Sequence, residues 1–232
     1  MQFTNSLIKG KLIKRYKRFF IDVKLDKEIV TAHCPNTGSM IGLLDKGNEV
    51  FISKNDDPKR KLKYTLEIIK VKKNLVGVNT HFANKIANHG LSNDLVKEIS
   101  KNDSIKPEVF FNKETRFDFL VEKNKQKIFV EVKNVTLFRN EKIAEFPDSV
   151  TSRGSKHLKT LIEAIKEGYK SYLLFLVQIQ GVENFKIAKD IDKEYYENYL
   201  LAKKAGVIFL AYRCKIDSKE IKIEKKIKII NV

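Results

Sequence analysis

The hydrophobic pattern of this 232-residue chain changes once, near residue 82, and that change limits the fold more than any other feature. Upstream of it, apolar and polar residues alternate over short runs, which is the period of half-buried β-strands. Turn-forming residues separate these runs. The five expected strands cover residues 12–25, 29–34, 49–53, 62–71 and 75–79. Five short strands with one helical turn, at 38–44, predict a partly open β-barrel of the OB-fold type.

Downstream of residue 82 the period lengthens. Residues 80–100 carry apolar side chains at helical spacing, which predicts two helices or one kinked helix. Strands are then expected at 108–111, 116–122, 127–138, 172–179, 207–212 and 220–230, with helices at 152–167 and 192–205. This order predicts a mixed sheet covered by helices. We therefore expect an α/β protein of two domains, residues 1–82 and residues 83–232.

The net charge of the chain is strongly positive. Lys and Arg number 46 against 29 Asp and Glu, giving +17. A polyanion such as nucleic acid is the natural partner for that field. Only seven of the basic residues are Arg, so the lysine surplus also fits the codon bias of an AT-rich genome. Charge alone therefore favours a nucleic-acid partner without proving it.

Other features of composition exclude several classes of protein. Hydrophobic residues make up 42% of the chain, too many for a disordered protein. No run of 18 apolar residues occurs, so no membrane span is expected, and the first residues do not resemble a secretory signal. Cys34 and Cys214 are too few for a disulfide framework. These features predict a cytoplasmic protein.

Two adjacent predicted strands carry the residue types needed for chemistry. On 127–138, Glu131 and Lys133 share one face because side chains alternate along a strand. On 116–122, Asp118 lies among apolar residues, and a hairpin would bring it beside them. Two carboxylates placed together repel, and a divalent cation removes the conflict. The arrangement predicts Mg²⁺ or Mn²⁺ held by Asp118 and Glu131, with Lys133 stabilising an attack on a phosphodiester. The alternative is a solvated strand face with an ordinary ion pair.

The spacing from Asp118 to Glu131 and Lys133 resembles the core of PD-(D/E)xK nucleases. In that core, the resemblance implies, the Asp and Glu bind the metal and the Lys assists catalysis. Phe117 stands where the signature has Pro. The position of the first acidic residue of such a site is left open between three candidates: Asp94, Glu98 and Glu108.

Over almost its whole length the chain also resembles the sugar fermentation stimulation protein A (SfsA) family. The motifs that carry the resemblance are Leu12–Phe19, His33–Met40, Asp57–Lys61, Val78–Thr80, Arg116–Phe119, Glu131–Thr136 and Phe146–Leu158. The resemblance implies an N-terminal OB-fold, a C-terminal PD-(D/E)xK nuclease-like domain and DNA binding with little sequence preference. The family name implies a regulatory link to sugar (maltose) metabolism.

Three short basic segments are candidates for binding nucleic acid. Basic side chains contact phosphates, and an aromatic ring can stack on a base. The candidate residues are Arg15, Tyr16, Lys17 and Arg18 in the first segment, Lys59, Arg60 and Lys61 in the second, and Arg153 and His157 in the third. For each segment the alternative is a solvated surface, and for His157 a partly buried side chain.

Three functions follow from these features. The first is a DNA-binding protein, of single or double strands, with an Mg²⁺-dependent nuclease site. The second is a regulator that binds DNA without cutting it. The third is an RNA-processing enzyme, because an OB-fold also accepts RNA. The sequence leaves open which of these applies, and it leaves the oligomeric state open as well.

Overall fold

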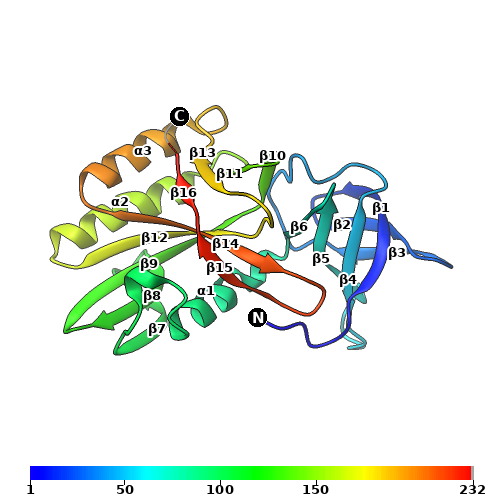
Figure 1. Ribbon diagram of the computed structural model, residues 1–232, viewed down its shortest axis with the longest axis horizontal. Helices are drawn as coiled ribbons and strands as arrows, with labels where there is room; N and C mark the ends of the chain where they lie inside the picture. Colours follow the sequence, from blue (N-terminus) through cyan, green and yellow to red (C-terminus); the bar gives the residue numbers. More distant parts are fainter. Residues whose placement is uncertain (231–232) are drawn as a thin grey trace.

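The computed structural model describes residues 1–230, so the last two residues of the predicted second domain lie outside the described range. A barrel of strands lies beside a larger region of strands and helices (Figure 1). The barrel region contains β1 Ile8–Tyr16, β2 Phe20–Lys24, β3 Ile29–His33, β4 Glu49–Lys54, β5 Tyr64–Val71 and β6 Asn74–Gly77. The strand order is β3-β2-β1-β4-β5-β6, and β3 also pairs with β5. That additional pairing closes the first five strands, which confirms the predicted OB-type barrel.

The alternating residues of these strands fill the barrel. Leu12, Ile21 and Val23 on β1 and β2 are 1% exposed or less, as are Ile52 and Leu66 on β4 and β5. The single strand predicted over 12–25 is instead a hairpin, because residues 17–19 turn between β1 and β2. This turn places the basic residues of the first segment at a hairpin tip rather than along a strand.

The larger region is built on a six-stranded mixed sheet. Its strands are β7 Ser104–Phe110, β8 Arg116–Lys123, β9 Gln126–Val135, β12 Lys170–Val177, β14 Ile208–Ile216 and β15 Ile221–Lys226, in the order β15-β14-β12-β9-β8-β7. The central strands β9, β12 and β14 are parallel, and the outer pairings are antiparallel. The predicted α/β class with a mixed sheet is therefore confirmed.

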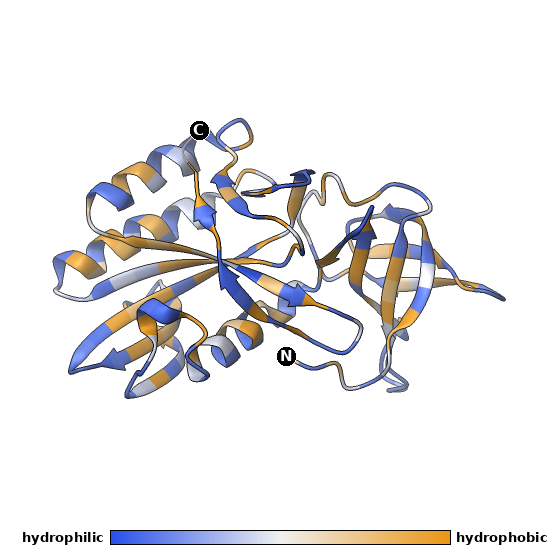
Figure 2. Ribbon diagram, viewed as in Figure 1, coloured by the Kyte–Doolittle hydropathy of each residue, from blue (hydrophilic) through white to orange (hydrophobic). Residues whose placement is uncertain are grey.

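Helices cover both faces of this sheet. They are α1 Ala83–Ser92, α2 Ser152–Lys166 and α3 Lys193–Lys204, with short 3-10 helices at Thr80–Phe82 and Lys97–Ile99. Helices α2 and α3 lie on one face and α1 on the other (Figure 1). The central strands are mainly apolar, and the helices carry hydrophilic residues along part of their surface (Figure 2). No helix among residues 1–230 is both long and apolar enough to cross a membrane.

A second, smaller sheet was not predicted. It consists of β10 Leu137–Asn140, β11 Ile143–Phe146, β13 Asn184–Ile187 and β16 Lys228–Ile229. The predicted strand 127–138 therefore ends at Val135, and the predicted strand 220–230 divides between two sheets. The reason is tertiary: β10 leaves the central sheet so that Phe138 can pack against the barrel.

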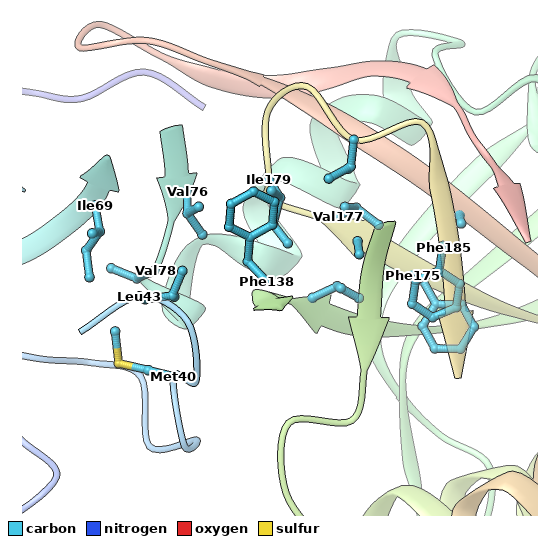
Figure 3. Packing of buried hydrophobic residues seen from close by; sticks show 14 of the residues in the cluster. Met40, Leu43, Ile69, Val76, Val78, Phe138, Phe175, Val177, Ile179 and Phe185 are labelled. Atoms are coloured by element: carbon cyan, nitrogen blue, oxygen red, sulfur yellow. The ribbon is translucent and has the colours of Figure 1, made fainter. Parts of the chain in front are cut away.

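The two parts share a continuous apolar core. Phe138 of β10 packs in one cluster with Met40, Leu43 and Val78 from the barrel side (Figure 3). Backbone bonds cross the same boundary, since the Gly77 N–H donates to the Gln178 carbonyl at 2.9 Å. At the other end, residues 1–3 pair with residues 219–221 of the second region, although the sequence division assigns them to the first domain. These contacts fix the barrel against the sheet.

The start of α2 is fixed by two hydrogen bonds of Thr151. Thr151 is the N-cap, accepting the Gly154 N–H at 3.0 Å, so Ser152 is the first helical residue, as the predicted helix over 152–167 requires. The Thr151 N–H in turn donates to Asp192, the N-cap of α3, at 2.8 Å. Gly168, with a φ of +89°, follows the end of the helix. This anchoring holds the first turns of α2 over the end of β9.

Candidate functional site

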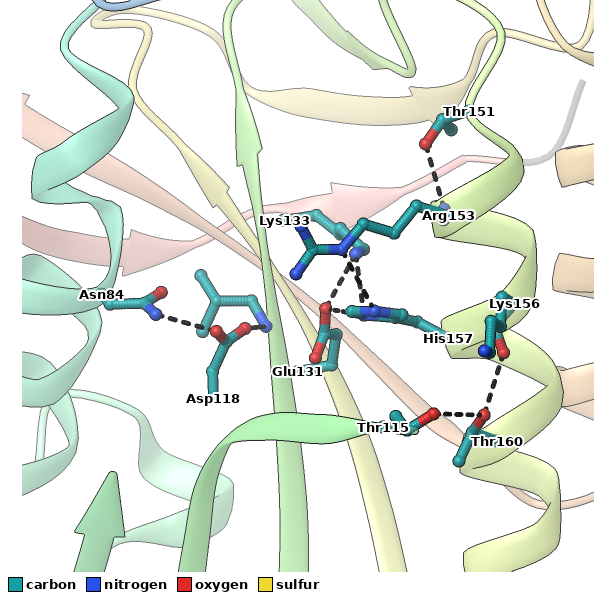
Figure 4. A network of polar contacts seen from close by, with 12 residues as sticks. Asn84, Thr115, Asp118, Glu131, Lys133, Thr151, Arg153, Lys156, His157 and Thr160 are labelled. Carbon is teal, nitrogen blue, oxygen red and sulfur yellow. Dashed lines mark hydrogen bonds and ion pairs between the residues drawn. The ribbon is translucent and has the colours of Figure 1, made fainter. Parts of the chain in front are cut away.

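The candidate site lies where β8 and β9 separate. Their register runs from Lys123 opposite Gln126 to Phe119 opposite Val130. At the next position the Asp118 carboxylate replaces a strand partner, accepting the Val132 N–H at 2.7 Å. Its other oxygen accepts the Asn84 side-chain amide of α1 at 2.8 Å (Figure 4). Asp118 is therefore held at a fork between two strands.

Glu131 lies on the other side of β9 at the same level (Figure 4). Its side chain is 4% exposed, and its Oε1 accepts the Lys133 ammonium at 2.8 Å and contacts His157 Nδ1 of α2. This confirms that Glu131 and Lys133 share a face of the strand. The second oxygen, Oε2, is buried without any hydrogen-bond partner in the described structure. A buried acceptor without a donor is costly, and no protein group among the described residues offsets that cost for this atom.

The two carboxyl groups have opposite electrostatic surroundings. Burial raises the pKa of Asp118 to about 6, and the nearby negative charge of Glu131 adds to that rise. Burial also disfavours the charged form of Glu131, but Lys133 and His157 outweigh it and lower its pKa. Glu131 is therefore a stable anion, whereas the charged form of Asp118 is disfavoured, and a nearby cation would lower its pKa.

The three candidates for a first acidic residue lie in different places. Glu108 of β7 borders the same cavity as Asp118 and is linked to it through Asn84, whose amide reaches Glu108 Oε1 at 3.3 Å. Asp94 instead accepts the Lys101 N–H at 2.7 Å. Glu98 is bound to Tyr212 and Lys226. Of the three candidates, Glu108 is therefore the one that the fold brings to the site.

Arg153 and His157 lie on the face of α2 that covers the fork. His157 is 8% exposed and contacts Glu131, which agrees with the alternative expectation of a partly buried side chain, and it also borders the cavity next to Asp118. Arg153 Nε approaches His157 Nε2 at 3.4 Å. The contacts of His157 with Glu131 and with Arg153 are both satisfied when the His157 ring carries its proton on Nδ1. Arg153 itself borders a cavity of about 720 Å³ that also contains Asp118 and His157.

The residues at the fork supply carboxylate oxygens of the kind that a divalent cation takes, from Asp118 and Glu131 on either side of β9 (Figure 4). Among residues 1–230, no three side chains of His, Cys, Asp or Glu lie close enough together to hold a metal ion by themselves. Mg²⁺ does not need such a cage, because it keeps several waters and binds through one or two carboxylates plus substrate phosphates. The partnerless oxygen of Glu131 and the raised pKa of Asp118 are what two ligands of an Mg²⁺ ion would show without it.

The basic residues of the barrel do not gather into one site. Arg15 donates to the carbonyls of Asn36 at 2.7 Å and Gly38 at 2.9 Å, so its guanidinium supports that loop. Tyr16 is 36% exposed and its ring stacks on Phe20 with centroids 5.5 Å apart. The other basic residues of the first two segments differ from one another in their exposure and contacts.

Lys17 and Arg18 form the hairpin tip with positive φ angles of 47° and 61°. Arg18 borders a cavity between the two parts of the molecule. Arg60 donates to Thr65 Oγ1 at 2.9 Å, whereas Lys59 and Lys61 are exposed in the turn before β5. The exposed lysines are therefore free to meet a polyanion, and Arg15 is committed to the fold.

Sequence reasoning missed Asn84, which joins Asp118 to Glu108. Asn84 is 34 residues from Asp118 in the chain and lies on the exposed side of α1, whose buried side carries Ile86 and Leu91. An asparagine on the polar side of a helix gives no signal of its own. Its role appears only when α1 docks against the fork.

Comparison with known proteins gives a consistent result. Residues 13–78 match the family model described as the SfsA N-terminal OB domain, and residues 81–220 match the sugar fermentation stimulation protein RE domain. A sugar fermentation stimulation protein homolog of Pelagibacter ubique is 87% identical over 231 residues, covering 100% of both chains. A homolog of Pseudoalteromonas atlantica is 44% identical, covering 99% of this chain and 100% of its own length.

A solved structure resembles the whole chain as well. It is the SfsA of Pyrococcus furiosus in complex with Ca²⁺, which is 25% identical. The TM-score is 0.88, and the match covers 100% of this chain and 98% of the other. The likeness therefore extends over both the barrel and the mixed-sheet region.

Proposed function

This chain belongs to the sugar fermentation stimulation protein family, and from that premise we propose that it binds DNA with little sequence preference and hydrolyses phosphodiester bonds at the fork between β8 and β9. The observation that carries the proposal is the buried Glu131 carboxylate. One of its oxygens is held by Lys133 and His157, and the other has no partner among the described residues. A purely structural ion pair would have no reason to leave that oxygen unsatisfied.

Asp118 and Glu131 would hold the metal, and Mg²⁺ is the ion we favour. The relative from Pyrococcus furiosus was solved with Ca²⁺, which supports a divalent cation in this fold. When bound, such an ion supplies an activated water and neutralises charge on the phosphate. Glu108 is linked to the fork through Asn84, and it would contact the metal through a bound water.

The other residues at the fork have roles that follow from their contacts. The Lys133 side chain is 13% exposed and its ammonium is paired with Glu131. It is therefore preorganised to donate to a phosphate oxygen. His157 orients Glu131 from behind, and Arg153 and Lys156 border the cavity with positive charge. Together they place cations around a phosphate that approaches from the cavity.

The barrel would supply affinity rather than chemistry. Lys17, Lys59 and Lys61 are exposed on hairpin tips and turns, where they can meet phosphates of any sequence. We place the activity in the cytoplasm because Cys34 and Cys214 are buried free thiols. A link to sugar (maltose) metabolism is a proposal that rests on the family name alone.

The test is a cleavage assay on labelled single-stranded DNA, duplex DNA and RNA, each with Mg²⁺, Mn²⁺ or EDTA. The wild-type protein is compared with a Glu131→Gln, Lys133→Met double variant, and binding is followed in parallel as salt is raised. We expect metal-dependent cutting that the double variant loses, with salt-sensitive binding that it keeps.

Two outcomes would replace this proposal. Salt-sensitive binding of DNA without cutting under any metal condition would leave a non-catalytic DNA-binding regulator. Cutting confined to RNA would identify an RNA-processing enzyme, which an OB-fold also permits. The same set of substrates therefore separates all three functions.

A further inference from the structure

The cavity at the fork has an aromatic wall that the proposed chemistry does not use. Phe110, the last residue of β7, borders the cavity of about 720 Å³ together with Asp118 and His157. Its side chain is 65% exposed, more than any other aromatic residue among the exposed large hydrophobic residues of the described chain. The next residue, Phe111, packs instead against Phe117 and Phe129. The core therefore accounts for Phe111 but not for Phe110.

Arg116 completes this wall. It lies directly opposite Phe110 in the pairing of β7 with β8, and its guanidinium carbon lies 5.7 Å from the centre of the Phe110 ring. A second contact holds it, because Arg116 donates to Glu108 at 2.7 Å. The guanidinium lies over one face of the Phe110 ring, which leaves the other face open, and aromatic rings and guanidinium planes are the groups on which nucleic-acid bases stack.

The loop that carries the pair is well supported. Residues 111–115 form a turn in which Asn112 Oδ1 accepts the N–H groups of Glu114 and Thr115. The Thr115 hydroxyl then lies 3.4 Å from that of Thr160 on α2. The backbone that carries the ring and the guanidinium is therefore fixed before any ligand arrives, which lowers the entropic cost of binding.

We propose that Phe110 and Arg116 form a stacking platform for an unpaired base next to the phosphate that is cut, so that this protein prefers single-stranded nucleic acid to an intact duplex. The proposal rests on the proposed function for the position of the phosphate. A base inside a duplex is stacked on both faces and cannot also stack on the Phe110 ring. A single strand can, and its phosphates then pass Arg153 and Lys156 across the same cavity.

The favoured occupant is a nucleic-acid strand rather than a protein segment, because cationic groups surround the ring. Arg116, Arg153 and Lys156 all border the cavity. Glu108 and Glu114 also border it, but each is already paired, with Arg116 and with Lys156 respectively. Asp118 is the third carboxylate of the cavity and a proposed metal ligand, so Arg153, which has no carboxylate partner among the described residues, is the cation left for a phosphate beside the aromatic face.

The experiment compares the wild type with two variants of Phe110 and one control variant by fluorescence anisotropy in EDTA, with an unstructured oligonucleotide and a hairpin duplex, each as DNA and as RNA. Phe110→Leu keeps an apolar side chain without a ring, and Phe110→Tyr keeps the ring. Leu201→Ala, at a 59% exposed apolar residue of α3, is the matched control. Melting temperatures verify that all variants fold.

We expect Phe110→Leu to weaken single-strand binding roughly 5- to 100-fold, in line with the contribution of one base–aromatic stack. Duplex binding should change less than about twofold, and Phe110→Tyr and Leu201→Ala should behave like the wild type. Equal losses on both substrates, or no loss on the single strand, would overturn the proposal.

The results also separate this inference from the proposed function. Cutting that is unaffected by Phe110→Leu would overturn the platform while the nuclease stands. A ring-dependent preference for single strands in a protein that never cuts would support the platform while the nuclease fails. The DNA and RNA arms identify which of the two strands the platform accepts.

Discussion

The barrel and the mixed-sheet region carry almost equal positive charge but use it differently. Residues 1–80 hold 17 basic and 8 acidic residues, and residues 81–232 hold 29 and 21. In the barrel, Lys59 and Lys61 stand exposed on a turn. In the second region, the Lys133 side chain is only 13% exposed and is paired with Glu131. Dispersed charge attracts a polyanion, whereas a focused and partly buried charge can act on one atom.

This difference explains why net charge is a poor guide to the site. The two regions have nearly the same surplus, but we expect chemistry only where burial and opposite charges converge. Substitutions that remove either the partly buried charge or the dispersed charge should therefore change cleavage and binding separately.

The largest effect should come from the focused charge. Lys133→Met should reduce single-turnover cleavage about 1000-fold, because one preorganised donor at a reacting oxygen is worth a factor of this order. Nucleic-acid affinity should change less than about twofold, since the barrel is intact. Lys186→Met is the control, because Lys186 is another lysine paired with a buried glutamate, Glu145, but lies away from the fork. Equal loss in both variants would contradict the assignment.

The next effect concerns the stability of the fork as pH changes. Because the pKa of Asp118 is raised to about 6, the folded protein binds its proton more tightly than the unfolded chain does. The free energy of unfolding therefore falls as pH rises from about 4 to about 6 and then levels off. Asp118→Asn removes this loss, so the variant should gain about 3 kcal/mol relative to the wild type across that range.

Urea unfolding in EDTA at pH values from 4 to 8 measures this difference. Other titrating groups are common to both proteins, so their contributions cancel in the comparison. A difference that stays constant with pH, or that shrinks as pH rises, would show that Asp118 is not held in a destabilised charged form.

The smallest effect should come from the dispersed charge. A Lys59→Ala, Lys61→Ala variant should bind DNA roughly 5- to 10-fold more weakly, with a salt dependence reduced by up to about 2 in log–log slope. Single-turnover cleavage at saturating protein should be unchanged, because neither lysine lies near the fork. A fall in the cleavage rate at saturation would show that the barrel does more than bind.

Sequence analysis placed the Glu131 and Lys133 side chains on one strand face and gave the fold class, but it missed part of the sheet architecture. Alternation along a strand was enough to place Glu131 and Lys133 on one face, because that period is local. The barrel followed from the spacing of short strands for the same reason. The small sheet that contains β10 was missed because its pairing depends on Phe138 packing against the barrel.

Other residues illustrate the same limit. Arg15 was expected at a phosphate, but it supports the loop of Asn36 and Gly38, a contact between residues more than 20 apart. His157 had two expected settings, an anion of the ligand or a partly buried position, and the structure shows it buried against the Glu131 carboxylate. In both cases the residue type predicted an anionic or acceptor partner, and only the tertiary fold decided which one.

The central claim is that Asp118 and Glu131 bind a divalent cation, and calorimetric titration with Mn²⁺ tests it directly. The wild-type protein is compared with Asp118→Asn, Glu131→Gln and Glu67→Gln. Glu67 is the matched control because it is a barrel carboxylate as buried as Glu131, at 3% exposure, with both oxygens bonded to protein groups. We predict one site in the wild type and in Glu67→Gln that is lost in the two fork variants. Equal Mn²⁺ binding by all four proteins would contradict the account.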